Sequence, residues 1–197
     1  SGMWPTIFGE LRSQKPESKI ACFNDWLAFN RLFEKGVVNR QRDAILLQAA
    51  SHHGYKGITR MASNYFKRKK PDFMFVHLDY VDHAGHHDGH GTQAYYDAVS
   101  VADEMIGKIV KAVKASGELE HTIILITADH GGIGHGHGGN TPEEVNVPWI
   151  LTGKGVVNGE LQVPIKTYDT AATLAYLLGI KAPECWDGKV ITQAIAH

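Results

Sequence analysis

Apolar positions along the chain alternate between the two periods that distinguish strands from helices. Three short apolar runs, 19–23, 72–81 and 122–128, are rich in aromatic and β-branched residues and are typical of strands buried in a parallel sheet. A fourth short run, 148–151, is also expected to form a strand. Apolar residues that recur every three or four positions predict helices over 6–12, 26–34, 58–70, from 92 to the glycine at 117, and 168–178.

This order of elements predicts the fold class. Strands that alternate with helices are typical of parallel strands joined by right-handed crossovers. We therefore expect an α/β fold with a mainly parallel sheet and helices on both of its faces. The 197 residues contain no internal repeat, low-complexity segment or clear linker, so the chain is expected to form a single domain over residues 1–197.

The charge balance narrows the range of partners. The 20 lysines and arginines nearly equal the 21 acidic residues, which argues against nucleic acid as a specific partner. The basic run 67–70 falls where a helix should end, and positive charge is favourable there. No apolar run approaches the roughly 20 residues that span a bilayer. The two cysteines are far apart and form no CxxC pair, so neither a disulfide framework nor a thiolate zinc site is indicated.

Histidine is concentrated at the ends of two predicted strands. Eight of the 12 histidines lie between His83 and His137. Asp82 and His86 are four residues apart around a glycine turn after one strand, and Asp129-His130 ends another strand. Sites in open α/β sheets form beyond the carboxyl ends of strands. Clustered imidazole and carboxylate groups favour a divalent ion such as zinc, with no thiolate required.

A family resemblance rests on these motifs and their order. The segments "PDFMFVHLDYVDHAGHHDGHG", "YYDAVSVADEMIGKIV" and "TIILITADHGG", with a later histidine before "NVPWIL", resemble the alkaline phosphatase superfamily. They are most similar to its type I phosphodiesterase/nucleotide pyrophosphatase branch, from about Pro71 to Leu151. The resemblance implies an α/β core that holds two metal ions, usually zinc, and a Thr or Ser nucleophile that forms a covalent phospho-intermediate.

Carried over residue by residue, the resemblance implies two sets of metal ligands. Asp82 and His86 would bind one ion together with a later histidine. His137 is preferred to the alternative, His135, because "HGGNTPEEVNVP" resembles the family's segment after that ligand. Asp129 and His130 would bind the second ion. The other histidines match no ligand position. Three are expected to orient ligands or to be exposed, namely His83, His87 and His90, and five receive no role, namely His52, His53, His77, His121 and His197.

The start of the chain departs from the family pattern. The family's first strand ends in a metal-binding Asp and leads to the nucleophile, whereas "MWPTIFGELRSQKPESKIACFNDW" resembles the region just after it. Thr6 follows Pro5 and is expected to begin a helix rather than to act as a nucleophile. The chain is therefore expected to be the C-terminal portion of a larger catalytic domain, with the nucleophile upstream. The sheet edge left by a missing strand predicts self-association.

The expected function is metal-dependent hydrolysis of a small-molecule phosphoester, with two ions roughly 4 Å apart that activate the nucleophile and stabilise the leaving oxygen. The alternatives are a sulfatase, a phosphomonoesterase, a phosphonate hydrolase or a phosphoglycerate mutase-like enzyme on the same scaffold, or a non-catalytic metal-binding module. No motif here fixes the substrate, because loops and inserted segments set specificity. The compartment also stays open, and export of the full-length protein to the periplasm or the cell exterior is compatible with the sequence.

Overall fold

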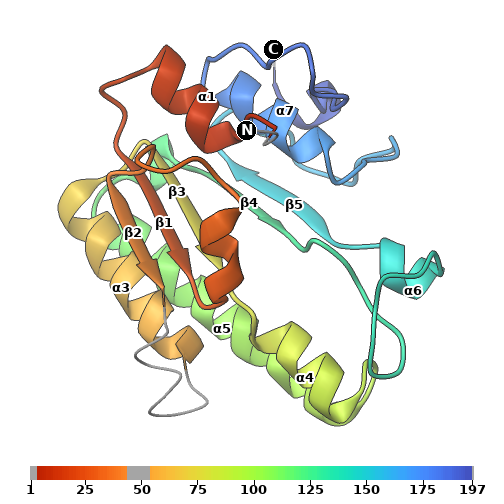
Figure 1. Cartoon of the computed structure of the whole chain (residues 1–197). Coiled ribbons are helices and arrows are strands. Elements are labelled where there is room, and N and C mark those ends of the chain that lie inside the picture. Colours follow the sequence, from red (N-terminus) through yellow and green to blue (C-terminus); the bar gives the residue numbers. More distant parts are fainter. Residues whose placement is uncertain (1–3, 44–53, 197) are drawn as a thin grey trace.

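The computed structural model describes residues 4–43 and 54–196 (Figure 1). Three strands form a parallel sheet in the order β2-β1-β3, and they comprise Arg40–Asp43, Ile20–Asn24 and Phe73–His77 respectively. Ala21 of β1 lies opposite Arg40 of β2 and opposite Met74 of β3. The central position of β1 explains why its apolar sequence, IACFN, is buried throughout.

Helices cover both faces of this sheet. On one face, α1 (Ile7–Gln14) and α7 (Asp169–Leu177) pack with Ile20 and Cys22 of β1 in one core cluster. On the other face, α3 (Gly54–Lys69) packs its apolar side against Ala21 and Phe23. Alternate residues of β1 therefore enter opposite cores, as the two-residue period of a strand requires. The predicted α/β class with helices on both faces is confirmed.

A second, two-stranded sheet differs from the expected topology. β4 (Ile123–Thr127) pairs with β5 (Trp149–Gly153), and the pair is antiparallel. The sheet is expected to be mainly parallel, and β5 is the exception, because no crossover helix of full length separates it from β4. The connection contains only the one-turn α6 (Pro142–Val145). Within the described residues β3 and β4 each have one strand partner, and self-association through their other edges stays a prediction.

Local structure differs from the predictions at three further places. Residues 72–81 were expected to be one strand, but β3 ends at His77 and α4 (Tyr80–Asp88) begins three residues later. The segment 26–34 forms only a short 3₁₀ helix, η1 (Leu27–Arg31), instead of an α-helix. The strand β2 was not predicted, because its sequence, RQRD, has no apolar residue and lies at the edge of the sheet.

The remaining helices agree with the sequence pattern or lie in connections. Thr6 caps α1 and accepts a hydrogen bond from the Gly9 N–H at 3.3 Å, which confirms its expected place at a helix start. α5 (Gln93–Ala115) begins after Thr92, whose hydroxyl accepts a hydrogen bond from the Tyr95 N–H. Short helices η2 (Leu119–His121) and η3 (Thr192–Ala194) complete the order of elements. No helix in the described residues is long and apolar enough to cross a bilayer.

Candidate metal centre

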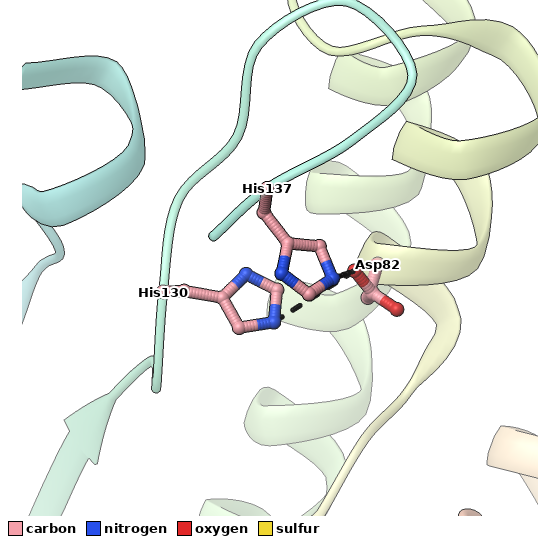
Figure 2. Close-up of side chains that lie close together, drawn as sticks. All are labelled: Asp82, His130 and His137. Atoms are coloured by element: carbon pink, nitrogen blue, oxygen red, sulfur yellow. Dashed lines mark ion pairs between the residues drawn. The ribbon is translucent and has the colours of Figure 1, made fainter. Parts of the chain in front are cut away.

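Two segments that are far apart in sequence bring an aspartate and two histidines together (Figure 2). Asp82 lies on the first turn of α4, and His130 and His137 lie on the loop that follows β4. One potential ligand atom from each of the three lies within 4.8 Å of the other two. The imidazole rings of His130 and His137 stack, with centroids 3.7 Å apart. The carboxyl ends of β3 and β4 therefore lead to one cluster, as expected for an α/β sheet.

The Asp82 carboxylate is the centre of this cluster. Its Oδ1 is buried and has no hydrogen-bond partner among the described residues. Three imidazole nitrogens surround it at distances too long for good hydrogen bonds, namely Nε2 of His86 at 3.5 Å, of His137 at 3.6 Å and of His130 at 3.9 Å. Ligand atoms bound to one tetrahedral zinc ion stand about 3.3 Å apart, given bonds of about 2.0–2.1 Å. The donor atoms and their spacing thus fit a divalent cation.

Backbone carbonyls orient two of these imidazoles. His130 Nδ1 lies 2.8 Å from the carbonyl oxygen of Gly131, and His86 Nδ1 lies 2.8 Å from that of His135. An N–H at Nδ1 leaves the Nε2 lone pair free for an ion, and metal-binding histidines commonly use such a second partner. His135 itself turns its Nδ1 to the carbonyl of His86 at 3.1 Å. The structure therefore brings His137, and not His135, to Asp82.

Asp82 and His86 share a face of a helix rather than a glycine turn. Residues four apart on a helix are neighbours, and the salt-bridge distance of 3.5 Å between the two follows from this spacing. Gly85 is required for another reason. A Cβ at this position would come within 2.4 Å of the His90 ring, and one at Gly132 would come within 2.1 Å. His90 thus packs α4 against the loop after β4, while the side chain of His87 is largely exposed.

The α6 turn fixes the loop that carries His130 and His137. The Gly131 N–H donates to the carbonyl of Glu144 at 2.7 Å, and a Cβ on Gly131 would lie 2.0 Å from the carbonyl oxygen of Glu143. The Glu144 side chain is buried and accepts a hydrogen bond from the Gly139 N–H at 2.8 Å. This bond, with others from Thr141, holds the pKa of the Glu144 carboxyl below its usual value. A charged Glu144 therefore closes the loop behind the ligands.

Asp129 is placed differently from Asp82. Its side chain is 78% exposed, and its Oδ2 lies 3.8 Å from His130 Nε2. His130 consequently lies between two carboxylates, at similar distances from Asp82 and Asp129. The group of Asp82, His130 and His137 therefore contains one carboxylate, and Asp129 lies outside this group, next to His130.

A second polar cluster at the strand ends was not recognised in the sequence. Asp25 follows β1, is 3% exposed, and accepts a hydrogen bond from the Asp79 N–H at 2.7 Å. His77, at the end of β3, places its Nδ1 3.4 Å from Asp25 Oδ1. Burial lowers the pKa of His77, but the hydrogen bond and charge of Asp25, with the charges of Asp79 and Asp129, outweigh it and raise the pKa. The one feature that indicates this pair is that the adjacent parallel strands β1 and β3 end at these residues.

The pairing gives a prediction for pH dependence. In Asp25→Asn, the pKa of His77 is expected to fall, because the main charge that favours imidazolium is removed. A raised pKa in the folded protein means that the pair stabilises the fold at low pH, and that this contribution is lost as pH rises through the His77 pKa. NMR titration of the His77 ring, with His121 as an internal reference, measures the shift. An unchanged His77 titration in the variant would contradict the assignment.

Comparison with known proteins identifies the family of this chain. Residues 12–142 match the family described as type I phosphodiesterase / nucleotide pyrophosphatase. The chain belongs to this family. The match confirms the resemblance to the alkaline phosphatase superfamily, whose members generally use divalent metal ions. It also includes Asp82, His130 and His137 of this phosphodiesterase-family chain.

Relatives of this phosphodiesterase-family chain are named as enzymes of different kinds. A human protein named GPI ethanolamine phosphate transferase 2, catalytic subunit, is 31% identical over 193 residues, which cover 94% of this chain and 20% of the relative. A phosphoglycerate mutase of Methanosarcina acetivorans, independent of 2,3-bisphosphoglycerate, is 35% identical over 127 residues, 58% of this chain and 21% of its own. The chain thus spans about a fifth of these relatives.

Solved structures show the same fold at low sequence identity. An alkaline phosphatase superfamily protein from Vibrio parahaemolyticus superposes with a TM-score of 0.68 and 16% identity, and it covers 100% of this chain and 52% of its own. A 2-O GAG sulfatase superposes with a TM-score of 0.66 and 14% identity over 98% of this chain and 56% of its own. The fold of the phosphodiesterase-family chain is therefore alkaline phosphatase-like.

Proposed function

We propose that this chain carries the metal-binding half of a phosphodiesterase site, in an enzyme that hydrolyses small-molecule phosphoesters with two divalent ions. The observation that carries the proposal is the buried Asp82 Oδ1, which has no hydrogen-bond partner in the described residues and faces three imidazoles. The family match supports a reaction at a phosphoester. Divalent ions at such a site neutralise charge on a transferring phosphoryl group.

The proposed ligands form two sets, with zinc as the metal. Asp82, His86 and His137 hold one ion, and Asp129 with His130 contributes to a second. The distances from Asp82 to His86 and to His137 support the first set, while the three ligand atoms that all lie within 4.8 Å of one another belong to Asp82, His137 and His130. His130 lies almost as near to Asp82 as to Asp129, so it is the residue that links the two sets. The chain's own residues hold and orient the ions, through the Nδ1 contacts of His86 and His130.

Zinc stoichiometry tests this division of ligands. We expect His86→Ala to weaken the tighter zinc site, and Asp129→Ala to affect only the weaker one, because Asp129 is largely exposed and shares a single histidine. Elemental analysis after zinc loading and equilibrium dialysis measures both sites. His83→Ala is the matched control, because His83 lies on the same helix as His86 whereas only His86 places its Nε2 3.5 Å from Asp82. Unchanged zinc content in His86→Ala would remove His86 from the ligand set.

Substrate preference is the second test of the proposal. An enzyme that contains this chain and its nucleophile is expected to cleave bis-p-nitrophenyl phosphate faster than p-nitrophenyl phosphate or p-nitrophenyl sulfate. The reason is the closeness of "DHAGHHDGHG" to the phosphodiesterase branch and the family match over residues 12–142. Parallel assays at equal enzyme and zinc concentrations decide the order. A preference for the sulfate ester would instead assign the site to a sulfatase.

A second candidate function is transfer of the phosphoryl-containing group to an alcohol. The match to the human ethanolamine phosphate transferase extends over 94% of this chain and favours this candidate. In transfer, the P–O bond to the leaving group breaks and a P–O bond to the alcohol oxygen forms, with the alcohol proton released. The two functions share the metal ligands and differ only in the acceptor. Product analysis in the presence of added ethanol separates a new phosphodiester from free phosphate monoester.

A further inference from the structure

A groove between α3 and α5 concentrates positive charge on one side of the molecule. The two helices lie side by side beneath the sheet in Figure 1 and pack against each other. The groove has a volume of about 450 Å³, and no carboxylate lines it. Its cationic residues are Lys56, Arg60 and Lys67 of α3 with Lys108 and Lys111 of α5. We refer to it as the α3/α5 groove.

Carboxylates of the described residues do not neutralise the cations of the α3/α5 groove, although Lys56 lies over the Tyr55 ring at 5.7 Å from its centroid. Among the described residues, none of the five forms an ion pair with a carboxylate, in contrast to Lys70, which pairs with Glu118 at 2.6 Å. The Lys108 ammonium lies 3.8 Å from the Met105 sulfur. The whole chain has a formal net charge of -1, so a general excess of basic residues does not explain the groove. Five exposed cations and no lining carboxylate give this depression a local positive charge.

A serine hydroxyl in the same groove also has no partner. Ser63 Oγ is buried from solvent and makes no hydrogen bond to the described residues. Such a hydroxyl is costly unless something accepts or donates to it. Like charges also destabilise a helix when they are three or four residues apart, as Lys56 and Arg60 are on α3. The groove thus carries two unfavourable features that a bound anion would relieve together.

We propose that the α3/α5 groove binds a small organic anion that carries two or more phosphate groups. Lys56 and Lys67 are eleven positions apart, which is about 16 Å along a helix, so the charges match a ligand with separated anionic groups better than a single phosphate. Cations on both walls of a concave groove suit a small ligand that enters it rather than a flat bilayer. The Ser63 hydroxyl supplies a hydrogen bond to a phosphate oxygen.

This site is separate from the metal centre. The residues that line the α3/α5 groove include none of the histidines or aspartates proposed as ligands. The proposal therefore stands or falls without regard to the phosphodiesterase assignment. Favourable charge at the C-terminus of α3, in the basic run 67–70, does not by itself account for the groove, because Lys108 and Lys111 come from a different helix.

Binding of inorganic tripolyphosphate to metal-free protein tests the proposal. We expect saturable binding by calorimetry, at a stoichiometry of one, in wild type and equally in Asp82→Ala. The triple variant Arg60→Ala, Lys108→Ala, Lys111→Ala should bind about tenfold more weakly or worse. The matched control removes the same charge elsewhere, at three exposed lysines, in Lys35→Ala, Lys154→Ala, Lys166→Ala. Circular dichroism and thermal unfolding check that both variants are folded.

The Ser63→Ala variant distinguishes tripolyphosphate binding in the groove from non-specific attraction to surface charge. This variant keeps every charge, and we expect it to weaken tripolyphosphate binding by several-fold while the control triple variant binds like wild type. Equally weakened tripolyphosphate binding in both triple variants would overturn the proposal, and so would an absence of tripolyphosphate binding in wild type. Parallel arms use inorganic phosphate and phosphatidylserine vesicles. Tighter binding of the protein to the vesicles than to tripolyphosphate would also overturn the proposal, because it would indicate that the groove binds a membrane surface.

Discussion

Purified chain of residues 1–197, loaded with zinc, is expected to hydrolyse bis-p-nitrophenyl phosphate no faster than zinc in buffer, although it binds the metal. The prediction rests on the expectation that no residue of this sequence is the family's Thr or Ser nucleophile, and Thr6, the candidate considered above, is the cap of α1. Loss of a nucleophile in covalent catalysis costs several orders of magnitude in rate. Continuous assay of p-nitrophenol release, with zinc content measured on the same sample, checks both halves of the prediction.

The control for this assay is a variant that removes a proposed ligand. Any measured turnover is expected to be the same in His130→Ala as in wild type, because background hydrolysis does not depend on the cluster. Zinc-dependent turnover in wild type that disappears in His130→Ala would show that a nucleophile within the chain has been overlooked. The sequence argument about the N-terminal region would then be wrong, while the ligand assignment would gain support.

Asp82→Ala is expected to have the largest effect on metal binding, and to weaken zinc at the tighter site by at least about a hundredfold. Asp82 supplies the carboxylate on which His86, His130 and His137 converge, so its removal takes away the shared ligand. It also leaves three imidazoles without the negative charge that balances a bound cation. Competition with a chromophoric zinc chelator measures the affinity.

A matched change on the same helix controls for the loss of a charge. Asp88, at the end of α4, contacts His87 instead of the cluster, and Asp88→Ala is expected to bind zinc as wild type does. In the absence of metal, Asp82→Ala is expected to unfold at the same or a slightly higher temperature, because the buried Oδ1 has no hydrogen bond to lose among the described residues. Similar zinc affinity in Asp82→Ala and Asp88→Ala would refute the central role of Asp82.

The chain's local patterns determined most of its elements. Short apolar runs located β1, β3 and β4, and the period of 3.6 located the long helices, because burial on one or two faces dictates which positions are apolar. The same patterns mispredict segments whose secondary structure depends on tertiary contacts. Polar β2 is a strand because it pairs with β1, and Tyr80 and Val81 are helical although they extend the apolar run of β3. The antiparallel direction of β5 is likewise a property of the pairing and not of its sequence.

The sequence by itself indicated the proposed metal ligands, and tertiary structure decided which of them lie together. Asp82, His86, Asp129, His130 and His137 were all indicated by motifs at strand ends. Chain spacing links His130 to its neighbour Asp129, whereas the folded loop also brings it to within 3.9 Å of Asp82. The pair of Asp25 and His77 and the α3/α5 groove were invisible for the same reason, since Asp25 and His77 are 52 residues apart and the groove residues come from two separate helices. Spacing along a chain fixes only near neighbours, and packing alone decides which distant residues share a site.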